Sequence, residues 1–467
     1  MKTRIEVEPE LIEKLEDIIG NEWVVTDKEV MLDYVADETA PTVCPEPAAA
    51  VVLVKPDTSQ EISNILKLAN QWKTFVFPRG GGTGLVGGSV PTENGIILSL
   101  ERMNRVIELD RQNLMIVVEA GVTLEKLMEA ADEANLLFPL HPGDEAAQVG
   151  GLVACNAGGV RAVRYGVMRN YVKGIDVVLP TGEILSLGGK TLKNVAGYDL
   201  MHLIVGSQGT LGVITKVILR LYPRFKETAT LIIPYESRHK ALETIPNVLR
   251  EGITPLAIEY MERGLMEESA KKLGKEWPVK RGKASLMIIA TGNSKEEVYL
   301  EADRIDKIAE QYDAIDTLVV ENRRKQNDIL SIRSNIYLTL KPYIMDVLDV
   351  AVPPANMEKL MDELDEIAAR YGMYLPMVGH AGDGNLHPHV LMKKAGGAKE
   401  EDLEKVKREI YSATLSLGGT ITAEHGIGKI RTKSLNDFLD KKTIGIMKKI
   451  KRVFDPNNIL NPGTIIS

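Results

Sequence analysis

A glycine-rich loop constrains the fold of this chain more than any other segment. Residues 78–91 read PRGGGTGLVGGSVP. The spacing of Gly82, Gly84 and Gly87 matches the GxGxxG fingerprint of dinucleotide-binding proteins, but that fingerprint requires a helix to begin inside the loop. Here Pro91, an Asn-Gly turn and the strand-like GIILSL follow instead. We therefore expect a loop that joins two strands, in a fold other than the nicotinamide-binding Rossmann type.

Such a loop can hold an anion. Glycine lets the backbone approach a ligand closely and point several N–H groups at a phosphate. A second segment of small residues, PGDEAAQVGGLVACNAGGVRAVRYG (142–166), offers the same close approach about sixty residues downstream. Two such segments can enclose one elongated ligand from two sides. The alternative is a glycine turn without a ligand, because turns collect glycine.

The hydrophobic pattern of the first half predicts mostly strands after an N-terminal helical segment. Apolar residues at helical spacing predict helices at 9–19 and 28–36, and a capping-box pattern from Thr58 to Glu61 opens a third. Residues 180–182 suit a hairpin turn. The predicted strands are 48–56, 74–78, 95–100, 113–121, 176–179, 183–187 and 210–223, and the third helix is 58–72.

From about residue 225, long helices alternate with strands. The predicted strands are 229–235, 284–292, 348–353 and 384–392, and the predicted helices are 294–312, 356–371 and 400–417. We interpret this half as a second α+β domain.

Composition narrows the class of function. The 467 residues are 44% hydrophobic and 26% charged, which is typical of a soluble globular protein of two or three domains. The net charge of -8 disfavours nucleic acid as a partner. No run is apolar enough to span a membrane and the N-terminus is unlike a signal peptide, so we expect a cytoplasmic location. Only Cys44 and Cys155 are present, which leaves any four-cysteine iron–sulfur cluster to a partner.

Histidines gather in one short run, GHAGDGNLHPH (379–389). His387 and His389 are two residues apart in a strand-like segment, so they point to one face, and a turn through AGDGN brings His380 back toward it. The pair Glu424-His425 offers a carboxylate and a base from another loop. Two histidines with one carboxylate form a common catalytic set for a divalent metal. The alternative is that these histidines cap turns or satisfy core hydrogen bonds.

Six motifs together resemble one family. They are PRGGGTGLVGGSVP (78–91), the GG..A.NAGG..RYG.MR pattern (150–169), GSQGTLGVIT (206–215), GHAGDGNLHPHV, ITAEHGIGK (421–429) and FDPNNILNPG (454–463). They resemble the FAD-linked 2-hydroxyacid dehydrogenases of the vanillyl-alcohol oxidase and p-cresol methylhydroxylase superfamily, which include the glycolate oxidase catalytic subunit, D-lactate dehydrogenases and D-2-hydroxyglutarate dehydrogenase.

The resemblance implies an α+β fold with an FAD-binding domain of two α+β subdomains and a C-terminal α+β cap domain with an antiparallel sheet. We expect an N-terminal helical segment (1–45), an FAD-binding domain of the p-cresol methylhydroxylase type (46–222), a substrate and cap domain with the metal site (223–453) and a C-terminal tail returning to the FAD domain (454–467).

The resemblance also implies which residues bind FAD. The pyrophosphate is expected on Arg79 to Gly84, and FAD is expected to be noncovalent because Thr83 stands where relatives with covalent flavin have histidine. Gln208 departs from the family, which more often has Glu there. The implied FAD-binding residues are Arg79, Gly80, Gly81, Gly82, Thr83, Gly84, Ser89, Pro142, Gly143, Asp144, Gly150, Gly151, Asn156, Ala157, Gly158, Gly159, Gly166, Ile214 and Asn461.

For the catalytic site, the resemblance implies His380, His387 and Glu424 as ligands of a divalent metal, which we expect to be zinc, with manganese or iron as alternatives. It makes His425 the base and Arg333 the clamp for the substrate carboxylate, while the role of His389 stays open. Relatives that act on a dicarboxylic substrate carry a lysine some fifteen residues beyond this arginine, and IMDVLDVAVP (344–353) has none.

The sequence therefore predicts the oxidation of a short D-2-hydroxyacid on FAD, with D-lactate first and glycolate next, and D-2-hydroxyglutarate as the alternative. Electrons would leave through an electron-transfer flavoprotein, an iron–sulfur subunit, a quinone or a cytochrome, in a homodimer or hetero-oligomer that could be held at a membrane by its partner. Two other classes stay open: a metal-dependent hydrolase and a flavin electron-transfer subunit without a substrate of its own.

Overall fold

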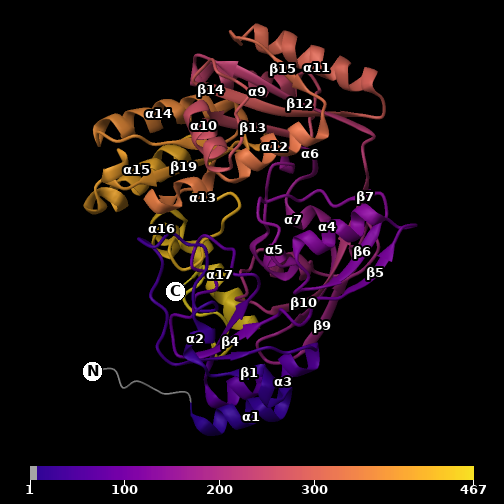
Figure 1. The fold of residues 1–467 in the computed structure, drawn as a ribbon. Helices are drawn as coiled ribbons and strands as arrows, with labels where there is room; N and C mark the ends of the chain where they lie inside the picture. Colours follow the sequence, from indigo (N-terminus) through magenta and orange to yellow (C-terminus); the bar gives the residue numbers. More distant parts are fainter. Residues whose placement is uncertain (1–7, 467) are drawn as a thin grey trace.

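The computed structural model describes residues 8–466 and stacks two bodies around separate hydrophobic cores. Figure 1 shows the first half of the chain below and the second half above, with the last helices descending again beside the first half. The expected α+β class is confirmed, and the body built from the second half has an antiparallel sheet.

The glycine loop connects two strands of a four-stranded sheet, whose order is β1-β2-β4-β3. Strand β2 (Val51–Val54) leads into α3 (Ser59–Trp72), whose N-cap Thr58 accepts the backbone N–H of Glu61, as the capping pattern predicts. Strands β2, β4 (Gly95–Ser99) and β3 (Phe75–Arg79) are parallel. The loop 80–94 thus joins two adjacent parallel strands, and no helix begins in it. The remaining elements of this part are α1 (Pro9–Ile19), η1 (Asn21–Trp23), β1 (Val24–Val25) and α2 (Lys28–Met31).

A five-stranded antiparallel sheet, of the order β5-β6-β10-β8-β9, forms the other half of this body. The predicted hairpin is confirmed, with the N–H of Leu179 donating to the carbonyl of Glu183 at 2.8 Å. The elements are β5 (Val106–Asp110), β6 (Met115–Glu119), α4 (Leu124–Glu133), β7 (Leu136–Leu137), α5 (Val149–Cys155), α6 (Ala162–Tyr165), α7 (Met168–Tyr171), β8 (Val172–Val178), β9 (Ile184–Gly188), α8 (Met201–Ile204), β10 (Val213–Arg220) and β11 (Tyr222–Pro223), which pairs with β7.

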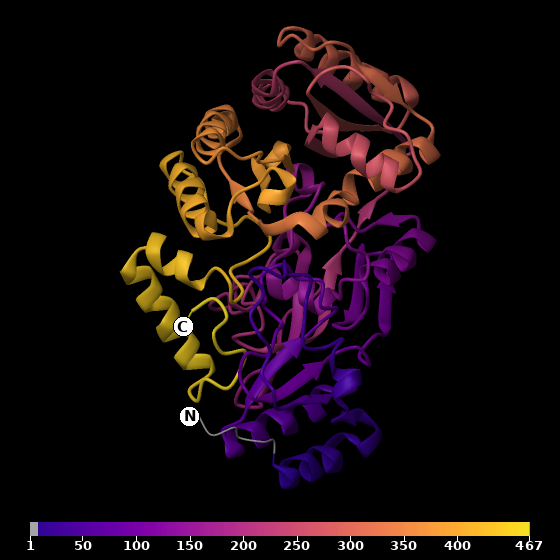
Figure 2. The ribbon, with the colours of Figure 1, turned by 60° about the vertical axis from the view of Figure 1, so that its left-hand side comes forward.

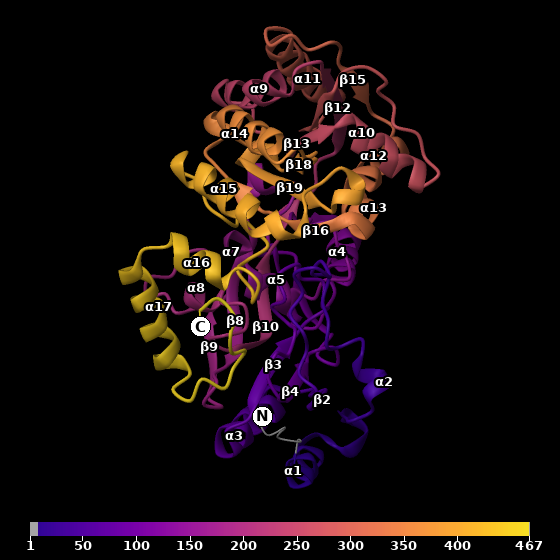
Figure 3. The ribbon, with the colours of Figure 1, turned by 90° about the vertical axis from the view of Figure 1, so that its left-hand side faces the viewer.

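The second body is built on one antiparallel sheet of the order β15-β12-β14-β13-β18-β19-β16, with β17 also paired to β19. In Figure 3, α14 and α15 cover one side of β13, β18 and β19, and α12 and α13 lie on the other. The strands are β12 (Glu227–Tyr235), β13 (Ala257–Glu262), β14 (Ala284–Gly292), β15 (Leu318–Val320), β16 (Ile344–Val347), β17 (Val350–Ala351), β18 (Met377–Gly379) and β19 (Asn385–Leu391). The helices are α9 (Arg238–Arg250), α10 (Arg263–Lys272), α11 (Lys295–Glu310), α12 (Arg323–Ser334), α13 (Ile336–Leu340), α14 (Met357–Arg370) and α15 (Leu403–Ser416), with short 3-10 turns η2 (Lys341–Tyr343), η3 (Pro354–Asn356), η4 (Ala381–Asp383), η5 (Lys393–Ala395) and η6 (Glu400–Asp402).

The chain finally returns to the first body through α16 (Thr432–Phe438) and α17 (Lys441–Phe454), which Figure 2 shows running beside it. Ile450 and Phe454 of α17 pack against the first core. Beyond α17, the backbone N–H of Val76 donates to Ile459, and that of Asn461 donates to Val76, each at 2.8 Å. These bonds place Asn461 beside the strand that leads into the glycine loop.

Two sequence predictions of secondary structure were wrong in part. The helix predicted at 28–36 ends at Met31, because the carbonyls of Asp33 and Ala36 accept hydrogen bonds from the Arg79 guanidinium instead of continuing a helix. The single strand predicted at 348–353 is only the two-residue β17. Asp349, which precedes it, turns its carboxylate toward the loop 422–425.

Candidate active site

One large cavity lies along the glycine loop, with about 1360 Å³ of empty space including its open mouth. The loop 78–89, the segment 142–158 and residues 208–214 form its walls, and Glu424, His425 and Asn461 complete them. The two glycine-rich segments therefore do face one space, as their composition predicted.

Most residues expected to bind FAD line this cavity. Those on its wall are Arg79, Gly80, Gly81, Gly82, Thr83, Gly84, Ser89, Pro142, Asp144, Gly150, Gly151, Ala157, Gly158, Ile214 and Asn461. A Cβ on Gly81 would lie 2.8 Å from the carbonyl oxygen of Ala146, and one on Gly158 would lie 2.4 Å from Oε2 of Glu424. Side chains at these two positions would clash, so the wall depends on glycine there.

The other four expected residues, Gly143, Asn156, Gly159 and Gly166, are not on the cavity wall. Asn156 ends α5 in the left-handed conformation, with φ 53°, and its Oδ1 accepts the N–H of Arg169 at 2.9 Å. A Cβ on Gly159 would lie 2.3 Å from the carbonyl oxygen of His141. Asn156 and Gly159 therefore lie behind the cavity wall, where they contact the backbone of neighbouring segments.

Arg79 lines the cavity, but its guanidinium already donates hydrogen bonds to backbone carbonyls. Its Nη1 donates to the carbonyl of Ala36 and its Nη2 to that of Asp33, each at 2.7 Å. The guanidinium also lies against Gly82, where a Cβ would be 2.2 Å from Nη2. Arg79 thus holds the segment before β2 against the glycine loop, a contact that the sequence did not indicate.

Sequence reasoning also missed part of the wall. Asp37, Gln208, Gly209 and Gly212 line the cavity. Gln208 was noted only as a departure from a motif, yet its Oε1 accepts the N–H of Gly428 at 2.7 Å and its carbonyl accepts from Asn461 at 2.9 Å. The GSQGTLGVIT motif could have suggested this wall, whereas no motif surrounds Asp37.

Three side chains expected to bind metal converge beside the cavity. Nε2 of His380 and Nε2 of His387 each lie 3.3 Å from Oε1 of Glu424. Burial favours the neutral form of Glu424, but His380 and His387 outweigh it and hold the pKa of this carboxyl well below its usual value. Burial disfavours a charged His380, but Glu259 and Glu424 raise its pKa well above the ordinary value.

A carboxylate lies behind each imidazole, within hydrogen-bond distance for His380 and beyond that distance for His387. Nδ1 of His380 lies 2.7 Å from Oε1 of Glu259, and Nδ1 of His387 lies 3.7 Å from Oδ1 of Asp349. Metal-binding histidines commonly have such a carboxylate behind them, because it fixes the ring and the tautomer. The donor set fits a divalent cation held by two Nε2 atoms and one carboxylate.

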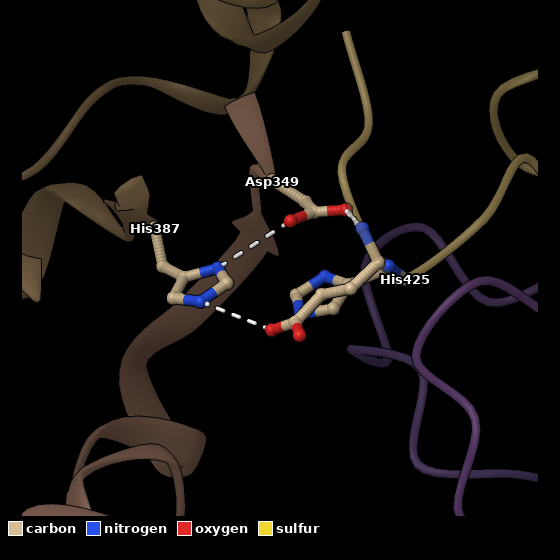
Figure 4. Close-up of side chains that lie close together, drawn as sticks. Asp349, His387 and His425 are labelled. Atoms are coloured by element: carbon tan, nitrogen blue, oxygen red, sulfur yellow. Dashed lines mark hydrogen bonds and ion pairs between the residues drawn. The ribbon is translucent and has the colours of Figure 1, made fainter. Parts of the chain in front are cut away.

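Asp349 organises the loop that carries Glu424 and His425. Its Oδ2 accepts the backbone N–H groups of Ala423, Glu424 and His425 at 2.8 to 2.9 Å. Figure 4 shows one carboxylate oxygen turned to the backbone of His425 and the other to the ring of His387. Asp349 lies within 4.8 Å of His387, Glu424 and His425 in a group that could hold a metal. This group contains the expected ligands His387 and Glu424 but does not contain His380. Because Oδ2 of Asp349 accepts three backbone N–H groups and its Oδ1 accepts the amide of Asn385 at 3.0 Å, we consider Asp349 a support of the loop.

His425 lies between this cluster and the cavity. Its ring stacks on that of His387, with centroids 5.0 Å apart and planes within 6°, and it lines the cavity wall. Burial lowers the pKa of His425 to about 4, so the ring is neutral near pH 7 and can accept a proton. Its Nδ1 has no hydrogen-bond partner among the described residues.

Arg333 and His389 lie close to the cluster, but neither contacts Glu424 in the way that His380 and His387 do. Nε and Nη2 of Arg333 face Oε2 of Glu259, at 2.9 and 2.8 Å, so the arginine is linked to His380 through Glu259. His389 is buried, and burial lowers its pKa to about 3. Its Nδ1 is without a partner in the described part of the chain.

Two family descriptions match this chain. Residues 50–188 match an FAD binding domain, and residues 224–465 match the C-terminal domain of FAD linked oxidases. This chain belongs to the FAD-linked oxidase family. The second match contains every residue of the histidine and carboxylate cluster, and the first contains the glycine loop.

Named relatives cover nearly the whole FAD-linked oxidase chain. It is 43% identical to a D-lactate dehydrogenase of Archaeoglobus fulgidus, over 93% of this chain and 95% of that one. It is 36% identical to a D-lactate dehydrogenase of Anaerostipes hadrus, over 98% of each. The glycolate oxidase subunit GlcD of Bacillus subtilis is 34% identical, over 89% of this chain and 88% of that one.

Solved structures share the fold. The 4-ethylphenol oxidase from Gulosibacter chungangensis superposes with a TM-score of 0.78 at 20% identity, over 98% of this chain and 96% of that one. A p-cresol methylhydroxylase gives a TM-score of 0.76 at 16% identity, over 97% and 96%. The fold that the resemblance implied is confirmed. Within residues 8–466, no helix is long and apolar enough to cross a membrane.

Proposed function

We propose that this FAD-linked oxidoreductase converts a short D-2-hydroxyacid to the 2-oxoacid, with D-lactate as the first candidate and glycolate as the second. One observation carries the proposal. Glu424 and His425 are adjacent in sequence and both line the cofactor cavity, while Glu424 also meets the two histidines. The proposed metal ligands and the proposed base therefore adjoin the space expected to hold the flavin.

Bound FAD would supply the hydride acceptor, and a divalent cation, with zinc as the first candidate, would supply a Lewis acid. His380, His387 and Glu424 would hold the cation. The glycine loop and the segment 142–158 would hold the cofactor noncovalently, because Thr83 offers no nitrogen for a flavin bond.

His425 would act as the general base. Its ring is neutral near pH 7, faces the cavity and is fixed by Asp349 through the backbone and by stacking on His387. In the oxidation, the substrate hydroxyl loses its proton to His425 while the hydrogen on C2 leaves as hydride. The products are the 2-oxoacid and the protonated imidazole, and bound FAD would accept the hydride.

Arg333 would bind the substrate carboxylate. Because Nε and Nη2 already face Glu259, Nη1 is the nitrogen left to meet a substrate. This position also gives Arg333 a second task, since it holds the carboxylate that orients His380.

The number of carboxylates on the substrate is inferred from the absence of a lysine in one segment. Residues 344–353 contain no lysine for a second carboxylate, which favours a monocarboxylic acid over D-2-hydroxyglutarate. A probable D-2-hydroxyglutarate dehydrogenase of rice is also a relative, at 31% identity over 96% of this chain, so that acid remains the alternative. With only two cysteines in the chain, we propose that a partner, either an electron-transfer flavoprotein or an iron–sulfur subunit, accepts the electrons.

Anaerobic bleaching of the flavin tests this function. We expect the purified protein to be yellow, to be bleached by D-lactate and more slowly by glycolate, and to contain about one divalent metal per chain. L-lactate and D-2-hydroxyglutarate serve as comparison substrates. A colourless protein would favour a metal-dependent hydrolase, and flavin that no 2-hydroxyacid reduces would favour an electron-transfer subunit.

A further inference from the structure

Asp37 is a charged residue of the cavity wall that lies before residue 50, where the matched FAD binding domain begins. Its Oδ1 accepts the N–H of Thr39 at 3.1 Å. Its Oδ2 is buried and has no hydrogen-bond partner of normal geometry among the described residues, although the Thr39 hydroxyl and the backbone of Ser89 interact with the same carboxylate. A buried carboxylate oxygen without a well-aligned donor is costly, so Oδ2 is left able to accept a hydrogen bond from a ligand in the cavity.

The backbone around Asp37 is fixed to the glycine loop. We call residues 33–39 the strap. Arg79, at the start of the loop, donates to the strap carbonyls of Asp33 and Ala36 at 2.7 Å each, and Gly87, near its end, donates its N–H to Oγ1 of Thr39 at 2.6 Å. Hydrogen bonds therefore fix the strap to both ends of the glycine loop, and we expect this loop to surround the FAD pyrophosphate.

The other side of the strap is fixed to the second body. The Tyr337 hydroxyl of α13 donates to the carbonyl of Glu38, and the Lys341 ammonium of η2 pairs with the Glu38 carboxylate. Glu38 is next to Asp37 in sequence. Asp37 thus sits in a segment held from two directions, and its carboxylate cannot leave the cavity wall unless these contacts break.

Oδ2 of Asp37 faces the backbone of the glycine loop. A Cβ placed on Gly84 would lie 3.8 Å from it. Burial raises the pKa of Asp37, while Thr39, Arg79 and Ser89 favour its charged form. In that charged form the carboxylate can only accept hydrogen bonds, as can the phosphates of FAD, so the two do not pair directly. The hydroxyl groups of the ribityl chain and the ribose are donors that a carboxylate can accept. Arg79, whose charge interacts with Asp37, offsets the negative charge beside the phosphates.

We propose that Asp37 is an FAD-binding residue, and that its Oδ2 accepts a hydrogen bond from a ribityl or ribose hydroxyl of the cofactor. This inference rests on FAD binding as part of the proposed function. It assigns a cofactor contact to the segment before the matched domain, where the sequence motifs assign none.

Titration of FAD into the full-length protein from which FAD has been removed tests this contact, with flavin fluorescence as the signal and no substrate present. Asp37→Ala should weaken FAD binding about tenfold or more, the usual effect of losing a hydrogen bond to a charged acceptor. Asp37→Asn should weaken it less, because an amide oxygen still accepts. Asp33→Ala is the matched control: it removes the same charge from the same strap, but its side chain is exposed and its carbonyl still binds Arg79.

Wild-type affinity in a folded Asp37→Ala protein would overturn the proposal. So would equal weakening in Asp33→Ala, since the effect would then belong to the net charge of the strap. If Asp37→Ala does not fold, the rise in Tm on adding FAD decides between Asp37→Asn and Asp33→Asn: a smaller rise in Asp37→Asn supports the contact and equal rises refute it. A wild-type protein that takes up no FAD would refute the proposed function itself, which separates the two failures.

Discussion

Oδ2 of Asp349 accepts the backbone N–H of His425 at 2.8 Å, although the two residues are 76 positions apart. The same oxygen holds the N–H groups of Ala423 and Glu424, so one buried carboxylate sets the place of a proposed ligand and the proposed base. Burial favours its neutral form, but His425 and His387 hold the pKa of Asp349 below its usual value.

Asp349→Ala should therefore damage the loop more than the cofactor cavity. We expect turnover to fall by about a hundredfold or more, with FAD retained, and unfolding to become easier by about 2–4 kcal/mol because several buried N–H groups lose their acceptor. Steady-state kinetics, flavin content and urea unfolding measure these effects. Asp362→Ala, which removes an exposed carboxylate paired with His239, is the control. An active Asp349→Ala enzyme would show that another contact positions His425.

His425→Ala should keep FAD and lose rapid flavin reduction. Removal of a general base costs about 10²- to 10⁴-fold in rate. Stopped-flow bleaching by D-lactate measures this, and His239→Ala, in a surface ion pair, serves as the comparison. Normal reduction in His425→Ala would remove the base assignment.

His387→Ala should lose bound metal and turnover while the flavin spectrum persists, because the cavity wall does not include His387. Treatment of the wild-type protein with a chelator should have the same effect, and added zinc should restore activity only to the wild type. Metal analysis by mass spectrometry checks the metal content. Full activity of a metal-free protein would return the histidine run to a structural role.

Arg333→Ala should raise KM for D-lactate by about tenfold or more, since one charged hydrogen bond to the substrate is lost. It should also reduce metal affinity, because Glu259 would lose the partner that holds it against His380. Arg333→Lys keeps the charge but not the planar fork and should recover only part of both effects. An unchanged KM together with reduced metal affinity would leave Arg333 the positioning role alone.

His141 should contribute to the loss of stability in acid. Burial and the charge of Arg161 lower its pKa to about 4, against 6.5 for a free histidine. Below pH 6.5 the unfolded chain takes up a proton that folded His141 does not, so its contribution is full above pH 6.5 and is lost as the pH falls toward 4. His141→Gln should make the fall of Tm between these pH values shallower. An identical slope would show that His141 is not neutral in the folded protein.

The sequence by itself determined the local structure and the types of residue available for chemistry. The capping pattern at Thr58 and Glu61, the hairpin at 180–182 and the strand after the glycine loop are set by contacts within a few residues, and each is present. The six motifs indicated the family because they carry the residues of the cavity wall and the histidine cluster, and the family is confirmed.

Only the tertiary structure decided which partners these residues meet. Asp349 and Glu259 support His387 and His380 from 38 and 121 positions away, and neither carboxylate stands in a motif. Arg333 donates to Glu259, and Arg79 donates to the strap carbonyls. Asp37 lines the cavity although it precedes the matched FAD binding domain in the sequence. The physical reason is that a buried charge requires a partner, while the identity of that partner depends on which distant strands and loops the packed cores bring together.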